Sequence, residues 1–272
     1  MTREELVQQI RLKHSFLCVG LDPDPAKLPI ALRNDPVGVV SFCDAIIKAT
    51  SPYSVAYKLN TAFFEALGRK GWDIIYETRA LLPKDCFLIA DAKRADIGNS
   101  SKFYARAFFE ELDFDAVTVA PYMGEDSVRP FLEYKDKWTI LLALTSNEGA
   151  ENFQMSRDEH GTLLFERVLT MAASWGTPEN LMFVAGATQK KHLQRVREIV
   201  PAHFLLIPGV GAQGGSLEDV TLTCLTDDIG ILVNSTREII YASDGNDFAQ
   251  KAAERAHSYQ KSMQSLLGNE YF

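Results

Sequence analysis

Eight short apolar runs recur along the chain, and helical segments separate them. The runs occupy residues 15–21, 54–60, 87–90, 116–121, 138–146, 181–187, 203–210 and 230–237. Continuous apolar runs are typical of parallel strands that are buried on both faces, and their alternation with helices predicts an α/β fold. Eight repeats in 272 residues favour a TIM (β/α)8 barrel, with residues 1–272 forming a single domain. An open doubly wound sheet is the alternative that this pattern leaves open.

Apolar residues at helical spacing predict the connecting helices. The expected helices cover residues 2–13, 36–50, 62–82, 102–112, 126–134, 161–174, 189–199 and 246–266. We expect Gly71 to interrupt the helix at 62–82, because glycine weakens a helix interior. The longest excursion starts at 147–160, which is polar and irregular in pattern.

The charge balance excludes two classes of partner. The chain carries 28 Lys and Arg against 36 Asp and Glu, a net charge of −8. Nucleic acids and anionic membranes both attract basic surfaces, so we expect neither as a partner. A phosphorylated small substrate stays compatible, because a few local cations suffice to bind it. No run reaches the length of a transmembrane span, and the N-terminus predicts an amphipathic helix instead of a signal peptide.

The cysteines and histidines show no metal-ligand spacing. Cys18, Cys43, Cys86 and Cys224 lie far apart, mostly in apolar surroundings, and the five histidines are equally scattered. Neither a Cys-x-x-Cys pair nor a Cys/His zinc pattern occurs, so we expect no metal site. Buried free thiols in a reducing, cytoplasmic compartment are the preferred interpretation.

The third strand ends in a concentration of charge. Its apolar run stops at Asp91, and Lys93 and Asp96 follow within five residues. Regular alternation along a strand would place Asp91 and Lys93 on the same face. Charges at the mouth of a buried strand are costly unless they are paired or used in chemistry. The stretch therefore predicts either a structural ion pair or a catalytic site.

In the catalytic interpretation, Lys93 stays protonated. Neighbouring carboxylates favour the charged form of a lysine, so we expect the pKa of Lys93 to rise. A protonated lysine is a poor nucleophile but a competent proton donor. A carboxylate held where substrate negative charge departs would raise the energy of the bound ground state.

Polar side chains end several other predicted strands. Lys58 and Asn60 are two residues apart and so share a face, Asp22 follows the first strand, and Ser146 ends the fifth. In a TIM barrel the C-terminal ends of the strands converge on one site, so we expect these groups to meet there. Plainer roles are a surface lysine for Lys58 and turn or helix caps for Asp22 and Ser146.

A glycine-rich turn follows the seventh strand, from Pro208 to Gly215. Backbone N–H groups of such a turn can face an anion, and barrels often bind phosphate after strands seven and eight. The glycine spacing does not fit a dinucleotide-binding fingerprint. Arg237 ends the eighth strand and would grip phosphate oxygens, although it can also be a surface arginine beside Glu238.

Taken in order, these motifs resemble the orotidine 5′-phosphate decarboxylase family, in its longer-chain branch. The resemblance runs from about Phe16 to Tyr241. It rests on Gly20-Leu-Asp22, Lys58-Leu-Asn60, Asp91-Ala-Lys-Arg-Ala-Asp96, Thr145-Ser146, Pro208-Gly-Val-Gly-Ala-Gln213 and Arg237. It implies a TIM barrel that decarboxylates orotidine 5′-phosphate to UMP and CO2, the last step of de novo UMP synthesis. The family uses neither a metal nor an organic cofactor.

The resemblance also implies catalytic roles. Lys93 would protonate C6 of the pyrimidine as CO2 leaves, and Asp91 would lie against the scissile carboxylate. Lys58 would bridge Asp91 and a ribose hydroxyl. Asp96 would reach across a dimer interface into the partner's site, so the working unit would be a homodimer.

The substrate-binding roles follow in the same way. Asp22 would bind the ribose, Ser146 the pyrimidine, and Gln213 with Arg237 the phosphate. The predicted set also contains Asn60, Pro208 and Gly209. Two features depart from the family pattern: Asn234-Ser-Thr-Arg237 stands where many relatives have Gly-Arg, and the excursion at 147–176 is longer than in compact relatives.

Three other functions stay open at this point. A metal-dependent sugar-phosphate synthase or decarboxylase of a related barrel would want acidic ligands where this chain has Lys58 and Ser146. A Schiff-base aldolase needs a lysine with a lowered pKa, which the neighbouring aspartates oppose. In a non-catalytic phosphate-binding barrel, the charged set would be purely structural.

Overall fold

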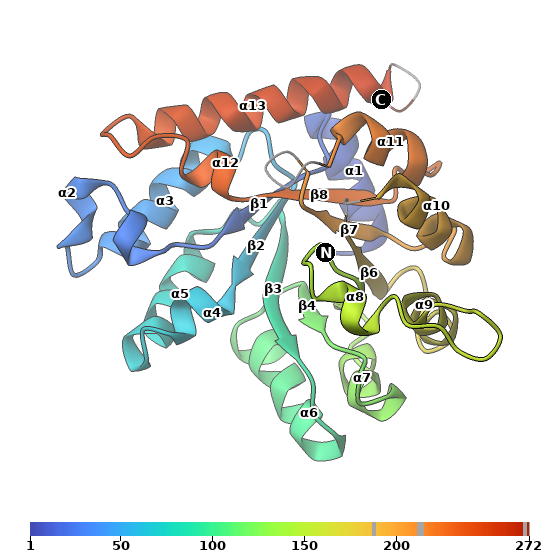
Figure 1. Cartoon of the computed structure of the whole chain (residues 1–272). Helices are drawn as coiled ribbons and strands as arrows, with labels where there is room; N and C mark the ends of the chain where they lie inside the picture. The colour runs from blue at the N-terminus through green and yellow to red at the C-terminus, as the bar shows by residue number, and fades with distance from the viewer. Residues whose placement is uncertain (187–188, 211–214, 269–270, 272) are drawn as a thin grey trace. The chain divides into compact units, whose positions relative to one another are not determined.

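The strands form a closed parallel barrel. The structure, a computed structural model, describes residues 1–186, 189–210, 215–268 and 271. Neighbouring strands follow chain order around the barrel (Figure 1). They are β1 (Leu17–Leu21), β2 (Ala56–Asn60), β3 (Phe87–Arg94), β4 (Ala116–Val119), β5 (Trp138–Leu144), β6 (Leu181–Ala185), β7 (Leu205–Pro208) and β8 (Ile231–Ser235). The predicted TIM barrel is thus confirmed, and the open sheet is excluded.

Burial on both faces explains why these strands read as unbroken apolar runs. Every residue of β1, β4, β6 and β8 is buried, including Asn234 and Ser235 of β8. Large side chains such as Trp138, Tyr57 and Phe183 are fully enclosed in the core. Removing such apolar surface from water is the main favourable term in folding.

Helices connect successive strands. Their bounds are α1 (Arg3–Lys13), η1 (Pro25–Lys27), α2 (Ile30–Arg33), α3 (Gly38–Thr50), α4 (Thr61–Glu65), α5 (Arg69–Leu81), α6 (Gly98–Arg106), η2 (Ala107–Glu111), α7 (Glu125–Leu132), α8 (Ala150–Phe153), α9 (Leu164–Ala172), α10 (Lys190–Ile199), α11 (Leu217–Cys224), α12 (Arg237–Ile240) and α13 (Phe248–Leu267). Among the described residues, no helix combines the length and the apolar character needed to cross a membrane.

The chain divides into two compact units. The terminal unit contains residues 4–92 and 234–272, and the central unit contains residues 1–3 and 93–233. In the terminal unit, α13 packs against α3 and α12 (Figure 1). In the central unit, α6 packs against α7, and α10 packs against α9 and α11. The division falls within β3, between Ala92 and Lys93.

Two strand registers in the terminal unit prepare the site. Gly20 on β1 lies opposite Lys58 on β2, and Asn60 lies opposite Asp91 on β3. Because the strands are parallel, their polar C-terminal residues come together at one edge of the sheet.

The structure corrects several predicted boundaries. The break in the 62–82 helix lies at residues 66–68, where Gly68 has φ +64°, and Gly71 lies inside α5. A Cβ on Gly71 would come within 1.7 Å of the Phe64 carbonyl oxygen, so this glycine serves close packing. Five short helices that pattern reasoning did not predict follow strand ends: η1, α2, α8, α11 and α12.

Candidate active site

A buried ion pair forms the centre of the site residues in the terminal unit. The Lys58 Nζ donates to Asp91 Oδ2 at 2.7 Å, and Asp22 Oδ1 lies 4.0 Å from the same nitrogen. The Lys58 and Asp91 side chains are only 7% and 10% exposed. Neighbouring strands position these side chains: Lys58 lies on β2, Asp91 on β3, and Asp22 directly after β1.

The charges of this cluster compensate for its burial. Burial alone would lower the pKa of Lys58, but the carboxylates of Asp91 and Asp22 raise that pKa above its ordinary value. The same charges act on Cys18 of β1, although burial is the main reason why its thiol pKa is raised to about 12. Lys58 is therefore a fixed cation at neutral pH, which suits electrostatic positioning and excludes a nucleophilic amine.

Gly20 is explained by a close approach between β1 and the residues after β8. A Cβ at position 20 would come within 1.9 Å of the Thr236 Oγ1. Asn234 Nδ2 donates to that same hydroxyl oxygen at 3.3 Å. Only glycine at position 20 leaves room for Thr236, which directly precedes Arg237.

Two predicted binding residues of the terminal unit are Asn60, which has a local structural role, and Arg237, which is exposed. The Asn60 side chain caps α4 by accepting from the Ala62 backbone nitrogen at 3.4 Å. Arg237 is exposed at the first position of α12, which keeps its guanidinium accessible to an anion. Asn60 thus serves as a helix cap at the end of its strand.

Lys93 lies in the central unit and has an uncommon backbone conformation. Its φ is +46°, and among the described non-glycine residues with positive φ it is the one inside a strand. Its backbone nitrogen donates to the Thr118 Oγ1 on β4 at 2.9 Å. Strained backbone of this kind clusters at functional sites. The left-handed turn also means that the rule of alternating faces does not apply beyond Ala92.

Asp96 follows β3 at the start of a turn into α6. Its carboxylate accepts from the Ile97 nitrogen at 2.8 Å, and its carbonyl oxygen accepts from the Ser101 hydroxyl. The Ser101 hydroxyl also lies 2.9 Å from the Ser127 carbonyl oxygen on α7. The Asp96 backbone is thereby fixed between α6 and α7.

The turn after β5 carries Ser146, and a residue of the polar excursion holds it in place. Gln154 accepts from the Thr145 nitrogen at 2.8 Å and donates to the Thr145 Oγ1 at 2.9 Å. From the other side, the bare backbone of Gly186 lies so close that a Cβ there would be 2.9 Å from the Ser146 nitrogen. Ser146 itself is half-buried.

The glycine-rich turn after β7 is described at its two ends. Pro208 ends β7, Gly209 has φ +88°, and the Gly215 nitrogen donates to the Gly209 carbonyl oxygen at 3.3 Å. This hydrogen bond closes the loop at its base. Gln213, the predicted phosphate ligand, lies outside the described residues.

Comparison with known proteins identifies the family. Residues 15–252 match the family described as orotidine 5′-phosphate decarboxylase / HUMPS. The chain belongs to this family. It is 51% identical over 270 residues to a Phocaeicola vulgatus protein named orotidine 5′-phosphate decarboxylase, an alignment that covers 98% of this chain and 99% of the relative. A Flavobacterium johnsoniae protein of the same name is 52% identical over the full length of both chains.

Solved structures agree with this membership. The Leishmania donovani OMP decarboxylase structure aligns with a TM-score of 0.80 and 34% identity, covering 96% of this chain and 99% of that one. The Leishmania donovani UMP synthase structure aligns with a TM-score of 0.80 and 36% identity. This chain spans 56% of the synthase chain, so the comparison says nothing about this chain from the rest of the synthase.

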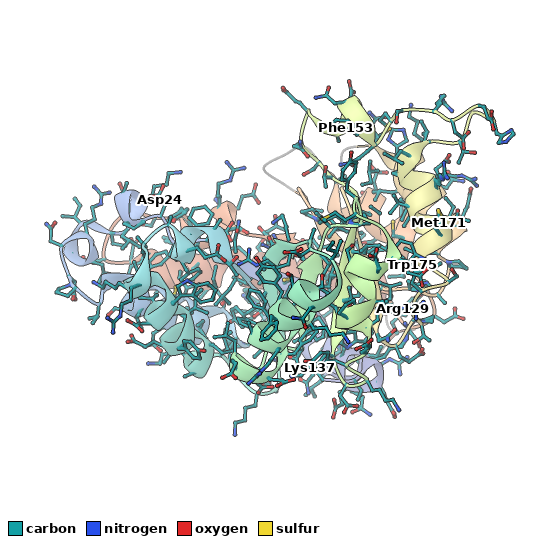
Figure 2. All side chains as sticks on the ribbon, turned by 90° about the horizontal axis from the view of Figure 1, so that it is seen from below. Asp24, Arg129, Lys137, Phe153, Met171 and Trp175 are labelled. Carbon is teal, nitrogen blue, oxygen red and sulfur yellow. The ribbon has the colours of Figure 1, made fainter. Side chains whose placement is uncertain are left out.

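Gln154 is a site-associated residue that sequence reasoning missed. The signal was weak, because a glutamine in an irregular polar segment matches no motif. The sequence indication was the unusual length of the 147–176 excursion, in which Phe153 on α8 is exposed (Figure 2). Gln154 acts on the Thr145-Ser146 turn through hydrogen bonds to Thr145.

The arrangement supplies fixed charge in a low-dielectric setting. A buried carboxylate, Asp91, is paired with Lys58 at 2.7 Å, and a second carboxylate, Asp22, lies 4.0 Å from the same ammonium. Such preorganised groups act strongly on charge that develops in a substrate, because they do not need to reorient. Among the described residues, no group of three His, Cys, Asp or Glu side chains is arranged as metal ligands.

Proposed function

We propose that this chain decarboxylates orotidine 5′-phosphate to UMP and CO2. Membership of the family and about 50% identity over the whole chain to proteins of that name support this activity. The observation that carries it is the buried Lys58–Asp91 pair with Asp22 beside it at the ends of barrel strands, and Lys93 two residues beyond Asp91. The reaction is the last step of de novo UMP synthesis, and the enzyme is a carboxy-lyase.

In the proposed mechanism, Asp91 and Lys93 have complementary roles. Asp91 lies against the scissile carboxylate, so bound substrate is relieved of like-charge repulsion as CO2 leaves. The bond from C6 to the carboxylate carbon breaks, and its electron pair stays at C6. The Lys93 ammonium transfers a proton to C6 and becomes a neutral amine. Lys58 bridges Asp91 and a ribose hydroxyl.

The remaining assignments concern substrate binding. Asp22 and Asn60 bind the ribose side, and Ser146 hydrogen-bonds the pyrimidine. Pro208, Gly209 and Gln213 form the phosphate turn, and Arg237 provides its cation. The exposed guanidinium of Arg237 and the left-handed Gly209 support these roles.

We also propose a homodimer in which Asp96 completes the partner's site. Exposed apolar side chains directly follow Asp96 or lie after β4: Ile97, Phe103, Tyr104, Tyr122 and Met123. The Ser101 hydroxyl on α6 lies 2.9 Å from the Ser127 carbonyl oxygen on α7, and α6 packs against α7. These exposed apolar side chains support burial of this region against another protein surface.

The proposal includes the cellular setting and the cofactor requirement. All four cysteines are buried free thiols, the state that a reducing cytoplasm maintains. Decarboxylation by fixed charges and a lysine needs no cofactor. We also propose residues 1–272 as one barrel domain, because both units contribute strands to a single barrel.

The decisive experiment follows the absorbance loss of orotidine 5′-phosphate in EDTA, for the wild type and for Lys93→Ala. We expect turnover in the wild type and its near disappearance in Lys93→Ala. Lys48→Ala is the matched control, because Lys48 is an exposed lysine that pairs with Asp44 on α3. Absence of turnover in EDTA, with Mg²⁺-dependent activity on a sugar phosphate instead, would overturn the proposal in favour of the metal-dependent relatives.

A further inference from the structure

The Tyr241 hydroxyl closes the turn that carries Asp22. Tyr241 follows α12, and its hydroxyl donates to the Asp22 carbonyl oxygen at 2.9 Å. The same hydroxyl oxygen accepts from the Asp24 nitrogen at 2.7 Å. One side chain therefore hydrogen-bonds both ends of the three-residue turn at residues 22–24. Figure 2 labels Asp24 in this turn.

The turn has few other ways to satisfy its backbone. Pro23 and Pro25 flank Asp24 and carry no N–H group, so the Asp24 nitrogen is the one backbone donor between them. The Asp24 carboxylate is used separately, because it caps η1 by accepting from the Ala26 nitrogen at 3.0 Å. Without Tyr241, the Asp24 donor and the Asp22 acceptor would both lose this partner.

Tyr241 is itself held firmly. Its ring stacks on Phe42 with a centroid distance of 5.8 Å, and Phe42 stacks in turn on Phe248 at 5.4 Å. Burial raises the pKa of Tyr241 to about 12, so the hydroxyl keeps its proton at neutral pH and can donate. The ring position is thus set by packing, and the hydroxyl transmits that position to the turn.

The turn decides where the Asp22 carboxylate lies. Asp22 Oδ1 is 4.0 Å from the Lys58 Nζ, and the Asp22 side chain is 19% exposed, so one side faces the ion pair while the group remains accessible. We propose that Tyr241 is a positioning residue, whose hydroxyl holds the 22–24 turn so that Asp22 meets a ribose hydroxyl of the substrate. This inference rests on the proposed function, in which Asp22 binds ribose.

The same segment would link the ribose and phosphate contacts. The Tyr241 nitrogen donates to the Arg237 carbonyl oxygen at 3.2 Å, which makes both residues part of one helical turn. A substrate that engages Arg237 through its phosphate and Asp22 through its ribose would therefore hold both ends of one hydrogen-bonded unit.

The test measures kcat and KM for Tyr241→Phe with three substrates: orotidine 5′-phosphate and its 2′-deoxy and 3′-deoxy analogues. Phenylalanine keeps the ring and its stacking and removes only the hydroxyl. We expect kcat/KM for orotidine 5′-phosphate to fall about tenfold, the scale of one hydrogen bond at a site. With the analogue that lacks the hydroxyl bound by Asp22, we expect a fall of less than about twofold.

Two further variants separate positioning from general damage. In an Asp22→Ala background, Tyr241→Phe should cause no additional loss, because the group that it positions is gone. Tyr57→Phe is the matched control: Tyr57 is a buried tyrosine of β2 whose hydroxyl bonds Thr50 and the Ile47 carbonyl oxygen. It should lower the free energy of unfolding without changing the preference among the three substrates.

Four outcomes would overturn the inference. An equal loss for all three substrates, or an undiminished loss in the Asp22→Ala background, would show that Tyr241 does not act through Asp22. Unchanged kinetics in Tyr241→Phe would show that the hydroxyl is dispensable. If Asp22→Ala keeps the wild-type preference for ribose hydroxyls, the ribose role of Asp22 fails together with the inference. That result concerns the proposed function of Asp22, whereas the other outcomes concern Tyr241 alone.

Discussion

The Lys58–Asp91 pair is a buried contact in which each charge compensates for the burial of the other. Each partner alone would be a costly buried charge, and together they are held at 2.7 Å with about a tenth or less of either side chain exposed. Such a pair contributes little net stability compared with apolar residues. Its loss on one side is expensive, because the remaining charge has no partner.

We expect Lys58→Met to destabilise the protein by about 3–5 kcal/mol at pH 7, because the Asp91 carboxylate stays buried without its cation. Urea denaturation measures this change. The matched control is Lys48→Met, which removes an equally short ion pair on the surface of α3, where the Lys48 side chain is 73% exposed. That control should cost less than about 1 kcal/mol. Similar losses for both variants would contradict the buried-pair argument.

His203 makes stability depend on pH. The residue is 7% exposed, and burial, with the charges of Arg3 and Arg197, lowers its pKa to about 4. The unfolded chain takes up the proton near the ordinary pKa of about 6.5, so the unfolded state binds more protons between these values. The free energy of unfolding should therefore fall as pH drops from 6.5 to 4, by at most about 3 kcal/mol from this group.

Urea midpoints at pH 7, 5.5 and 4.5 test this prediction. In His203→Leu the loss on acidification should be smaller than in the wild type. His160→Leu provides the control, because the His160 side chain is 80% exposed in the polar excursion. A wild-type pH profile in His203→Leu would refute the assignment.

At the scale of elements, the excursion after β5 is a positioning device. α8 brings Gln154 back onto Thr145, the residue directly before Ser146. The two hydrogen bonds satisfy the Thr145 nitrogen and fix its hydroxyl, which itself donates to Asn147 Oδ1 at 2.6 Å. The excursion thus supplies hydrogen-bond partners to the residue that follows β5.

We expect Gln154→Leu to lower kcat/KM about tenfold, mainly through KM, while the free energy of unfolding changes by about 1–2 kcal/mol. The kcat/KM of Gln154→Glu should lie between those of the wild type and Gln154→Leu, because a glutamate still accepts from the Thr145 nitrogen but has no amide donor. Steady-state kinetics compare these variants with Gln250→Leu, which removes an exposed glutamine of α13 that bonds Glu254. An equal effect in Gln250→Leu would remove the special role of Gln154.

At the scale of the whole molecule, a shared site makes a prediction about mixtures. If Asp96 completes the partner's site, Lys93→Ala and Asp96→Asn should each be nearly inactive alone. After subunit exchange, an equal mixture should regain about a quarter of wild-type activity, because half of a random dimer population is mixed and each mixed dimer has one intact site.

Activity after mixing, together with mass from sedimentation equilibrium, measures this outcome. The control mixture joins Lys93→Ala with Lys58→Met, which damage the same site and should not complement each other. Failure of the first mixture to regain activity, despite proven exchange of subunits, would place Asp96 in its own chain's site.

The sequence by itself determined the barrel and the identity of its charged strand ends. Burial of a strand requires an apolar run, and polar groups are tolerated mainly at the strand ends. Both features are therefore visible in the local sequence pattern. This is why Asp22, Lys58, Asp91 and Lys93 could be singled out from residue order. The predicted break at Gly71 failed because a glycine can serve close packing as well as a turn.

Tertiary structure alone decided the contacts that hold these residues. Tyr241 and Asp22 are 219 positions apart, and Gln154 reaches Thr145 from an irregular segment, so neither contact leaves a periodic signal. The left-handed backbone of Lys93 depends on Thr118 of the next strand. Local sequence specifies which groups a strand end carries, whereas their positions depend on hydrogen bonds that form only when distant segments pack together.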